Sequence, residues 1–195
     1  MQKREFLALA AVTWGWGWSG ASAGTLGAEP AAVTVACAGA HVSATEVTGY
    51  WVGLMQPHWE SARMQRIAYA EVPSRAHGVA ALTDGGFVAV ANRPGRWLAR
   101  LDAKAQVQCM LNTTDAVRTF EGHLTVSPDG QWVYTTETDP RTGQGWVAVR
   151  DVRTLQAVAE FRTGGSEPHQ LLLDGAGMLV AVSYTHLTLP TKRIV

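Results

Sequence analysis

A repeat of about 46 residues runs through this chain. Histidines occur at three positions 46 residues apart, and each is followed five to seven residues later by an Asp-Gly pair. The histidines are His77, His123 and His169, and the pairs begin at Asp84, Asp129 and Asp174. A period of about 40 to 50 residues is the size of one four-stranded blade of a β-propeller. The repeat therefore predicts a propeller before it indicates any chemistry.

The composition agrees with an all-β fold and argues against several functions. The 16 basic and 16 acidic side chains balance, so nucleic-acid binding is not expected. Twenty glycines, eight tryptophans and runs of Val, Thr and Ala broken by Asp-Gly or Pro favour short strands over long helices. Cys37 and Cys109 are too few for a disulfide framework. We interpret them as small buried hydrophobic residues, and a single bridge in an oxidising compartment is the alternative.

The turn residues place strands within each repeat. In the unit that begins at His123, strands are expected at 123–127, 131–136, 146–150 and 155–161. In the preceding unit they are expected at 77–82, 87–91, 97–101 and 106–111. An earlier, less regular blade contributes strands at 50–54 and 66–72, and residues 169–181 give the first half of a further one. Residues 24–181 should therefore hold about three and a half blades of an all-β propeller that has roughly seven in the complete parent.

Both ends of the chain are expected to lie outside the propeller. Residues 1–23 have the pattern of an export signal that resembles the twin-arginine type, with Lys3 in place of the first arginine before Arg4. The mature protein is thus expected in the periplasm, without a membrane span; general secretory export and a membrane anchor are the alternatives. Residues 182–191 match one reading frame of a transposon-end adapter used in DNA sequencing libraries. We interpret residues 182–195 as an artefact, and a genuine C-terminal strand is the alternative.

The three histidines are the candidate binding residues. Each stands at the start of the first strand of its unit, which is normally the innermost strand of a blade. The repeat therefore directs His77, His123 and His169 towards one axis. Imidazoles that converge on a polar channel can ligate iron, copper or zinc, or a haem placed over the channel mouth. The alternative is structural, because a repeated histidine often ties the loop of one blade to the next strand.

Several carboxylates lie near these positions. Glu121 and Glu167 precede His123 and His169 by two residues, so they share a strand face with the imidazoles and could ligate a metal or orient the rings. Arg75 takes that place before His77. We interpret the remaining acidic pair, Glu137 and Asp139, as solvated loop carboxylates. Residues 24–181 contain no Gly-x-Ser-x-Gly motif and the chain has no P-loop, so no catalytic residue is assigned.

Several short motifs occur in an order that resembles one bacterial family. The motifs are Arg75-Ala-His-Gly78, Asn92-Arg-Pro-Gly-Arg96, the stretch at 122–130, Tyr134-Thr-Thr-Glu137 and Glu167-Pro-His169. Over roughly residues 30–181 the chain resembles the family catalogued as domain of unknown function 1513. The resemblance implies an exported protein related in shape to the quinoprotein and YVTN-type propellers. Members are often encoded near imelysin-like and di-haem-oxidoreductase-like proteins, which implies periplasmic iron-handling proteins as partners.

These observations predict the N-terminal part of a periplasmic propeller that acts as a binding or accessory protein in iron or other metal handling, without catalysis of its own. The cofactor is left open between a transition metal, iron or copper, and a haem. One alternative is a propeller oxidoreductase or lactonase-type hydrolase whose channel metal activates substrate or water. The other is a protein-interaction scaffold. Because half a propeller has open sheet edges, residues 24–181 are expected to aggregate or dimerise.

Overall fold

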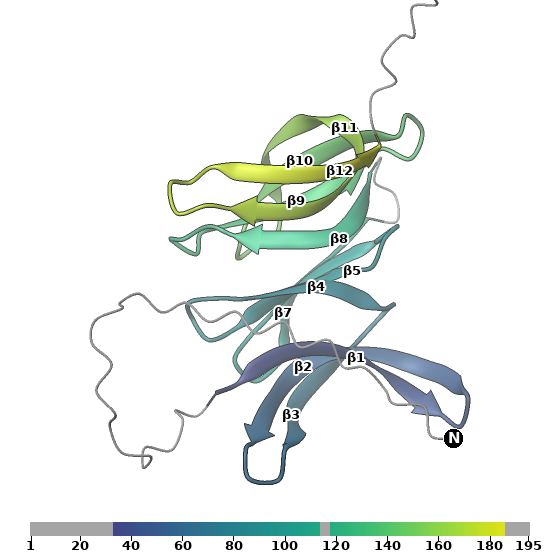
Figure 1. The fold of residues 1–195 in the computed structure, drawn as a ribbon, viewed down its shortest axis with the longest axis vertical. Coiled ribbons are helices and arrows are strands. Elements are labelled where there is room, and N and C mark those ends of the chain that lie inside the picture. Colours follow the sequence, from purple (N-terminus) through teal and green to yellow (C-terminus); the bar gives the residue numbers. More distant parts are fainter. Residues whose placement is uncertain (1–32, 114–117, 186–195) are drawn as a thin grey trace, which may run out of the picture. The chain divides into compact units, whose positions relative to one another are not determined.

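Residues 33–113 and 118–185 are described in the computed structural model, and all regular structure within these ranges is β-strand. Their twelve strands form three antiparallel sheets, each built from consecutive strands (Figure 1). Among these residues there is no helix with the length and apolar character needed to cross a membrane. The expected export signal, residues 1–23, and residues 186–195 lie outside the described ranges.

The first sheet contains β1 (Val35–Ser43), β2 (Glu46–His58) and β3 (Arg63–Val72), in that order. The strands expected at 50–54 and 66–72 are confirmed as parts of β2 and β3. The sequence did not indicate β1, because its run of Ala, Gly and Cys residues has little β propensity. Cys37 lies on β1, and both it and Cys109, in the second sheet, are half-buried free thiols.

The second sheet contains β4 (Ala76–Ala81), β5 (Phe87–Ala91), β6 (Trp97–Leu101) and β7 (Val107–Asn112), in sequence order. All four expected strands are confirmed to within one residue at each end. The Asp-Gly pair makes the first turn: Gly85 has a φ of 85°, and Asp84 Oδ1 accepts a 2.9 Å hydrogen bond from Gly86 N.

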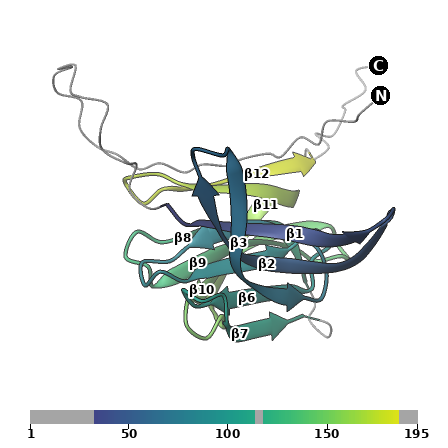
Figure 2. The same cartoon turned by 90° about the horizontal axis from the view of Figure 1, so that it is seen from below.

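The third sheet contains β8 (Thr119–Val126), β9 (Trp132–Thr138), β10 (Gln144–Asp151), β11 (Ala157–Leu173) and β12 (Leu179–Thr185). Figure 2 shows β8, β9 and β10 side by side. The 17-residue β11 has two roles. Its first half pairs with β10 as the last strand of this blade, and its second half pairs with β12 to begin the next. Because β12 ends at Thr185, it includes the first residues of the segment 182–195.

Consecutive sheets pack through both faces of the central strands. Phe87, Ala89 and Ala91 of β5 point into a core shared with the first sheet. Val88 and Val90 point the other way, into a core shared with Phe120, Val133 and Leu155 of the third sheet. The first strands also follow one another: β1 lies against β4, β4 against β8, and β8 against β11. Sheets of consecutive antiparallel strands, buried on both faces and joined through their first strands, form a partial β-propeller.

Candidate metal centre

Each candidate histidine lies at a β-bulge in the first strand of its blade. On β4, Ala76 and Gly78 pair with successive residues of β5, so His77 between them has no partner. On β11, His169 is likewise the extra residue between Pro168 and Gln170. A bulge interrupts the alternation of a strand and turns a side chain in a new direction. The orientation of both imidazoles is therefore set by the same feature, a β-bulge at the histidine.

The bulge at His123 is larger. Phe120 of β8 pairs with Glu137 of β9 and Leu124 pairs with Thr135, so the three residues between Phe120 and Leu124 stand opposite Thr136 alone. One of the three, Gly122, has a φ of 92°, which favours glycine. The irregular backbone thus recurs at the equivalent place in three successive blades.

The three imidazoles converge. The Nε2 atoms of His77 and His123 are 3.1 Å apart, and those of His123 and His169 are 3.2 Å apart. One ligand nitrogen from each of the three rings lies within 4.8 Å of the other two. The repeat predicted this convergence, although it did not predict the separation between the rings. Residues 46 and 92 positions apart in the chain thereby share one small site.

Two glycines allow the strands that carry His77 and His123 to approach. A Cβ atom added to Gly78 would lie 2.6 Å from the carbonyl oxygen of Gly122. A Cβ atom added to Gly122 would lie 3.0 Å from Cδ2 of the His77 ring. Any larger residue at either position would push β4 and β8 apart, so the imidazole separation depends on both glycines.

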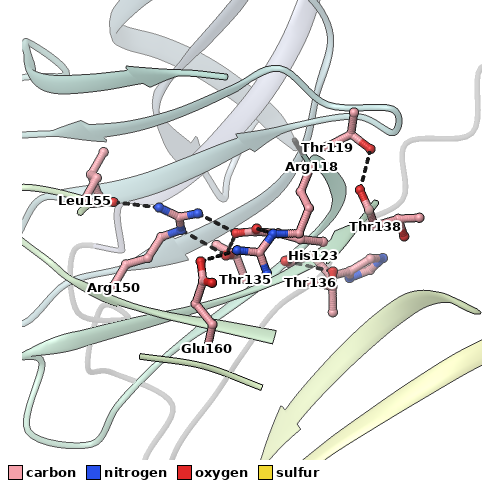
Figure 3. A network of polar contacts seen from close by, with 10 residues as sticks. Arg118, Thr119, His123, Thr135, Thr136, Thr138, Arg150, Leu155 and Glu160 are labelled. Carbon is pink, nitrogen blue, oxygen red and sulfur yellow. Dashed lines mark hydrogen bonds and ion pairs between the residues drawn. The ribbon is translucent and has the colours of Figure 1, made fainter. Parts of the chain in front are cut away.

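Thr136 joins the other pair of bulges, and Figure 3 shows it beside His123. Its Oγ1 lies 3.3 Å from the carbonyl oxygen of His123 and 3.3 Å from that of His169. The hydroxyl is buried on β9 and can donate its proton to either carbonyl. Thr136 therefore fixes β8 and β11 relative to each other at the two histidines.

The surroundings keep the imidazoles neutral. Burial lowers the pKa of His123 to about 4, with further lowering by the charges of His169, His77 and Arg93. Burial also lowers the pKa of His77, helped by His169, Arg75 and Arg93, and burial with Arg93 lowers the pKa of His169. A neutral imidazole presents a lone pair, which is the form that binds a metal.

The two carboxylates expected beside the histidines lie outside the group of converging ligand atoms, which consists of the three imidazoles within the described ranges. Glu121 is buried in the same bulge as His123, and burial raises the pKa of its carboxyl group. Glu167 is exposed, and its Oε2 lies 4.0 Å from Nη1 of Arg93. These positions indicate that Glu121 and Glu167 influence the charge near the site and do not themselves act as ligands.

A family model described as "Protein of unknown function (DUF1513)" matches residues 70–185, from the last residues of β3 to the end of β12. The chain belongs to the DUF1513 family. The match includes all three histidines, and the description assigns no function. No curated protein matches the chain.

Two solved structures are similar to this DUF1513 chain. A protein of unknown function from Bacteroides caccae is 9% identical with a TM-score of 0.48, over 66% of this chain and 45% of that one. The Dos1 propeller is 14% identical with a TM-score of 0.47, over 68% of this chain and 37% of that one. The match thus covers less than half of either structure's own length.

The DUF1513 chain also has a buried ionic network on the opposite face of β9 (Figure 3). The interpretation of Glu137 as a solvated loop carboxylate is wrong: its side chain is 4% exposed on β9, where it accepts hydrogen bonds from Arg150 and Thr135. Asp139 does lie in the following loop, where it accepts from Arg141 N. A cavity of about 350 Å³ borders this network and is lined in part by Arg118 and Glu160, which form an ion pair.

Sequence reasoning missed three contributors to the site: Thr136, the pair Gly78 and Gly122, and Arg93. The glycines had a visible signal, since Gly78 directly follows one histidine and Gly122 directly precedes another. Thr136 and Arg93 had none, because their partners come from strands that are distant in the sequence.

Proposed function

We propose that this protein is a metal-binding accessory propeller in which His77, His123 and His169 hold one transition metal ion. The observation that carries the proposal is the pair of Nε2 separations, 3.1 and 3.2 Å, between imidazoles from three different strands. Nitrogens that bind one ion at about 2.0–2.1 Å in tetrahedral geometry stand about 3.3 Å apart. These two separations are close to that value, whereas the ligand nitrogens of the remaining pair, His77 and His169, lie within 4.8 Å of each other.

Hydrogen bonding alone explains the arrangement less well. A neutral Nε2 atom has either one proton or one lone pair. The His123 Nε2 atom lies within hydrogen-bond distance of two other Nε2 atoms, so it can form a good hydrogen bond to only one of them. A structural histidine needs a single partner, whereas three neutral imidazoles can all donate their lone pairs to one cation.

The ligand set favours a divalent ion of intermediate hardness or a soft one. Three neutral nitrogens suit iron, copper or zinc, whereas calcium and magnesium prefer oxygen ligands. A haem fits less well, because its iron has two axial positions and the third imidazole would have no place. Three protein ligands leave at least one coordination position open.

We further propose that the protein works in the periplasm, next to iron-handling proteins, as a carrier or accessory subunit without its own catalysis. Support comes from the export signal expected at residues 1–23 and from the resemblance of the sequence motifs to a family often encoded near such proteins.

Titration calorimetry on the purified 195-residue chain tests the metal site. We expect one equivalent of Fe(II), Cu(II) or Zn(II) to bind, and His123→Ala to weaken binding about 100-fold or more. His58→Ala is the matched control, because His58 contacts Gln65 in the β2–β3 hairpin and should leave the affinity unchanged. Absence of binding, or equal affinity in the wild type and His123→Ala, would overturn the proposal.

A further inference from the structure

One loop is attached to the backbone beside two of the histidines and faces the third. It connects β5 to β6 and carries Arg93. Asn92 N donates a 2.8 Å hydrogen bond to the carbonyl oxygen of Arg75, two residues before His77. Gly95 N donates to the carbonyl oxygen of Phe120 at 2.8 Å and Gly95 O accepts from Phe120 N at 3.0 Å, three residues before His123.

The Arg93 side chain extends to the third histidine-bearing strand. Its Nη1 lies 4.0 Å from Oε2 of Glu167, two residues before His169. The loop is thereby tied to each of the three strands two or three residues before its histidine. Its place is set by close packing, since a Cβ atom on Gly95 would lie 2.8 Å from the carbonyl oxygen of Ala91.

The backbone at Glu167 is strained. Its φ of 47° lies in the left-handed region, which non-glycine residues rarely adopt. Such conformations collect at ligand sites, where the surrounding contacts hold them in place. At Glu167 the conformation coincides with the ion pair to Arg93, so the strained residue and the guanidinium belong to one arrangement.

The charge of Arg93 is unfavourable for a site that holds only a cation. Its loop is hydrogen-bonded beside the strands that carry His77 and His123, and its guanidinium lies 4.0 Å from the Glu167 carboxylate, two residues before His169. A site for a bare metal ion would be stabilised by a neutral or acidic residue at this place. The same guanidinium becomes favourable when an anion occupies the remaining coordination position of the ion.

We infer that the ion held by the histidines binds a small carboxylate, with one oxygen on the ion and the other accepting a hydrogen bond from Arg93. This inference rests on the proposed metal site. A guanidinium is planar and has five donors, so it can bind Glu167 and an incoming carboxylate together. At 40% exposure the Arg93 side chain is accessible to a ligand from solvent.

The test uses the full chain loaded with Co(II), whose visible absorption reports on its ligands, and acetate as the probe at constant ionic strength. Acetate should change the Co(II) spectrum of the wild type with saturation. Arg93→Gln should weaken acetate binding about tenfold or more, because a charge-assisted hydrogen bond is lost. Arg93→Lys should give an intermediate affinity for acetate, since lysine keeps the positive charge and lacks the planar guanidinium with its paired donors.

Two controls separate this inference from the metal site. Co(II) should bind Arg93→Gln as tightly as the wild type or more tightly, because a repulsive charge is removed. Arg153→Gln makes the same charge change on the exposed β10–β11 turn and should leave acetate binding unchanged.

The outcomes are distinct. Equal acetate affinity in the wild type and Arg93→Gln, with Co(II) bound to both, overturns the carboxylate inference and does not contradict the proposed metal site. Failure of the wild type to bind Co(II) overturns the metal site and the inference with it. If circular dichroism shows that Arg93→Gln does not fold, wild-type acetate affinity in Arg93→Lys overturns the inference.

Discussion

Thr135 and Thr136 are neighbours on β9 whose side chains serve different purposes. The Thr136 hydroxyl reaches the carbonyl oxygens of His123 and His169. The Thr135 hydroxyl donates to Glu137 at 2.9 Å and accepts from Arg150 Nε at 3.2 Å. Strand alternation sends successive side chains to opposite faces, so one threonine supports the candidate metal site and the other supports the ionic network.

Replacing each threonine with valine separates these roles. We expect Thr136→Val to lower the free energy of unfolding by about 1–2 kcal/mol and to weaken metal binding about tenfold, because the two histidine bulges lose their common anchor. Thr135→Val should lower stability by a similar amount and leave metal affinity unchanged. Chemical denaturation and titration calorimetry measure the two quantities, and equal metal affinity in both variants would show that Thr136 does not position the histidines.

Gly122 combines a demanding backbone with a close neighbour. We expect Gly122→Ala to cost about 2 kcal/mol or more of stability and to weaken metal binding, because the new methyl group adds a 3.0 Å contact with the His77 ring to the strain of a φ of 92°. Gly143→Ala is the matched control, since Gly143 has a φ of 71° with open space around it. It should cost about 1 kcal/mol without a change in metal affinity. Equal losses of stability in the two variants, measured by denaturation, would show that contact with His77 is unimportant.

At the scale of the strands, turn chemistry explains why so much of the fold could be predicted. In the first two repeats, the aspartate accepts a backbone hydrogen bond two residues on, and the glycine beside it has a positive φ. In the third, Asp174 keeps its role but the positive φ moves to Gly177. These contacts are local, so they are visible in the sequence.

Register and bulges could not be predicted in the same way. The bulge at His123 is defined by which residues of β9 stand opposite it, and the burial of Glu137 depends on Arg150 from the next strand. Such features depend on pairing between strands rather than on local residue preference. The sequence therefore placed the three histidines together, and it missed the loop and the threonine that hold them.

The pairing of β9 with β10 leads to a prediction about stability. Glu137→Gln should lower the free energy of unfolding by about 3–5 kcal/mol, because it leaves the Arg150 guanidinium, 8% exposed, without its charged partner. Arg141→Ala is the control: it breaks the ion pair with Asp139, in which Arg141 is 74% exposed, and should cost less than about 1 kcal/mol. Urea denaturation measures both, and a loss below about 1 kcal/mol for Glu137→Gln would mean that the network does not stabilise the blade.

For the whole molecule, the decisive feature is the apolar face at the end of the third sheet. Within the described ranges β12 is an edge strand, paired on one side with β11. Leu172 and Val180 are cross-strand partners with 55% and 43% of their surfaces exposed. An apolar edge strand with free backbone groups readily pairs with another chain.

We therefore expect residues 24–181 to self-associate, and Val180→Lys to weaken that association about tenfold or more, because a charge would be buried between the edges. Val47→Lys makes the same change at an exposed position of β2 and should leave the association unchanged. Sedimentation velocity over a range of concentrations measures the effect. A monodisperse, cooperatively melting monomer would contradict the argument from an open propeller edge. Self-association that persists in Val180→Lys and disappears in Val47→Lys would instead show that the interface lies on the first sheet.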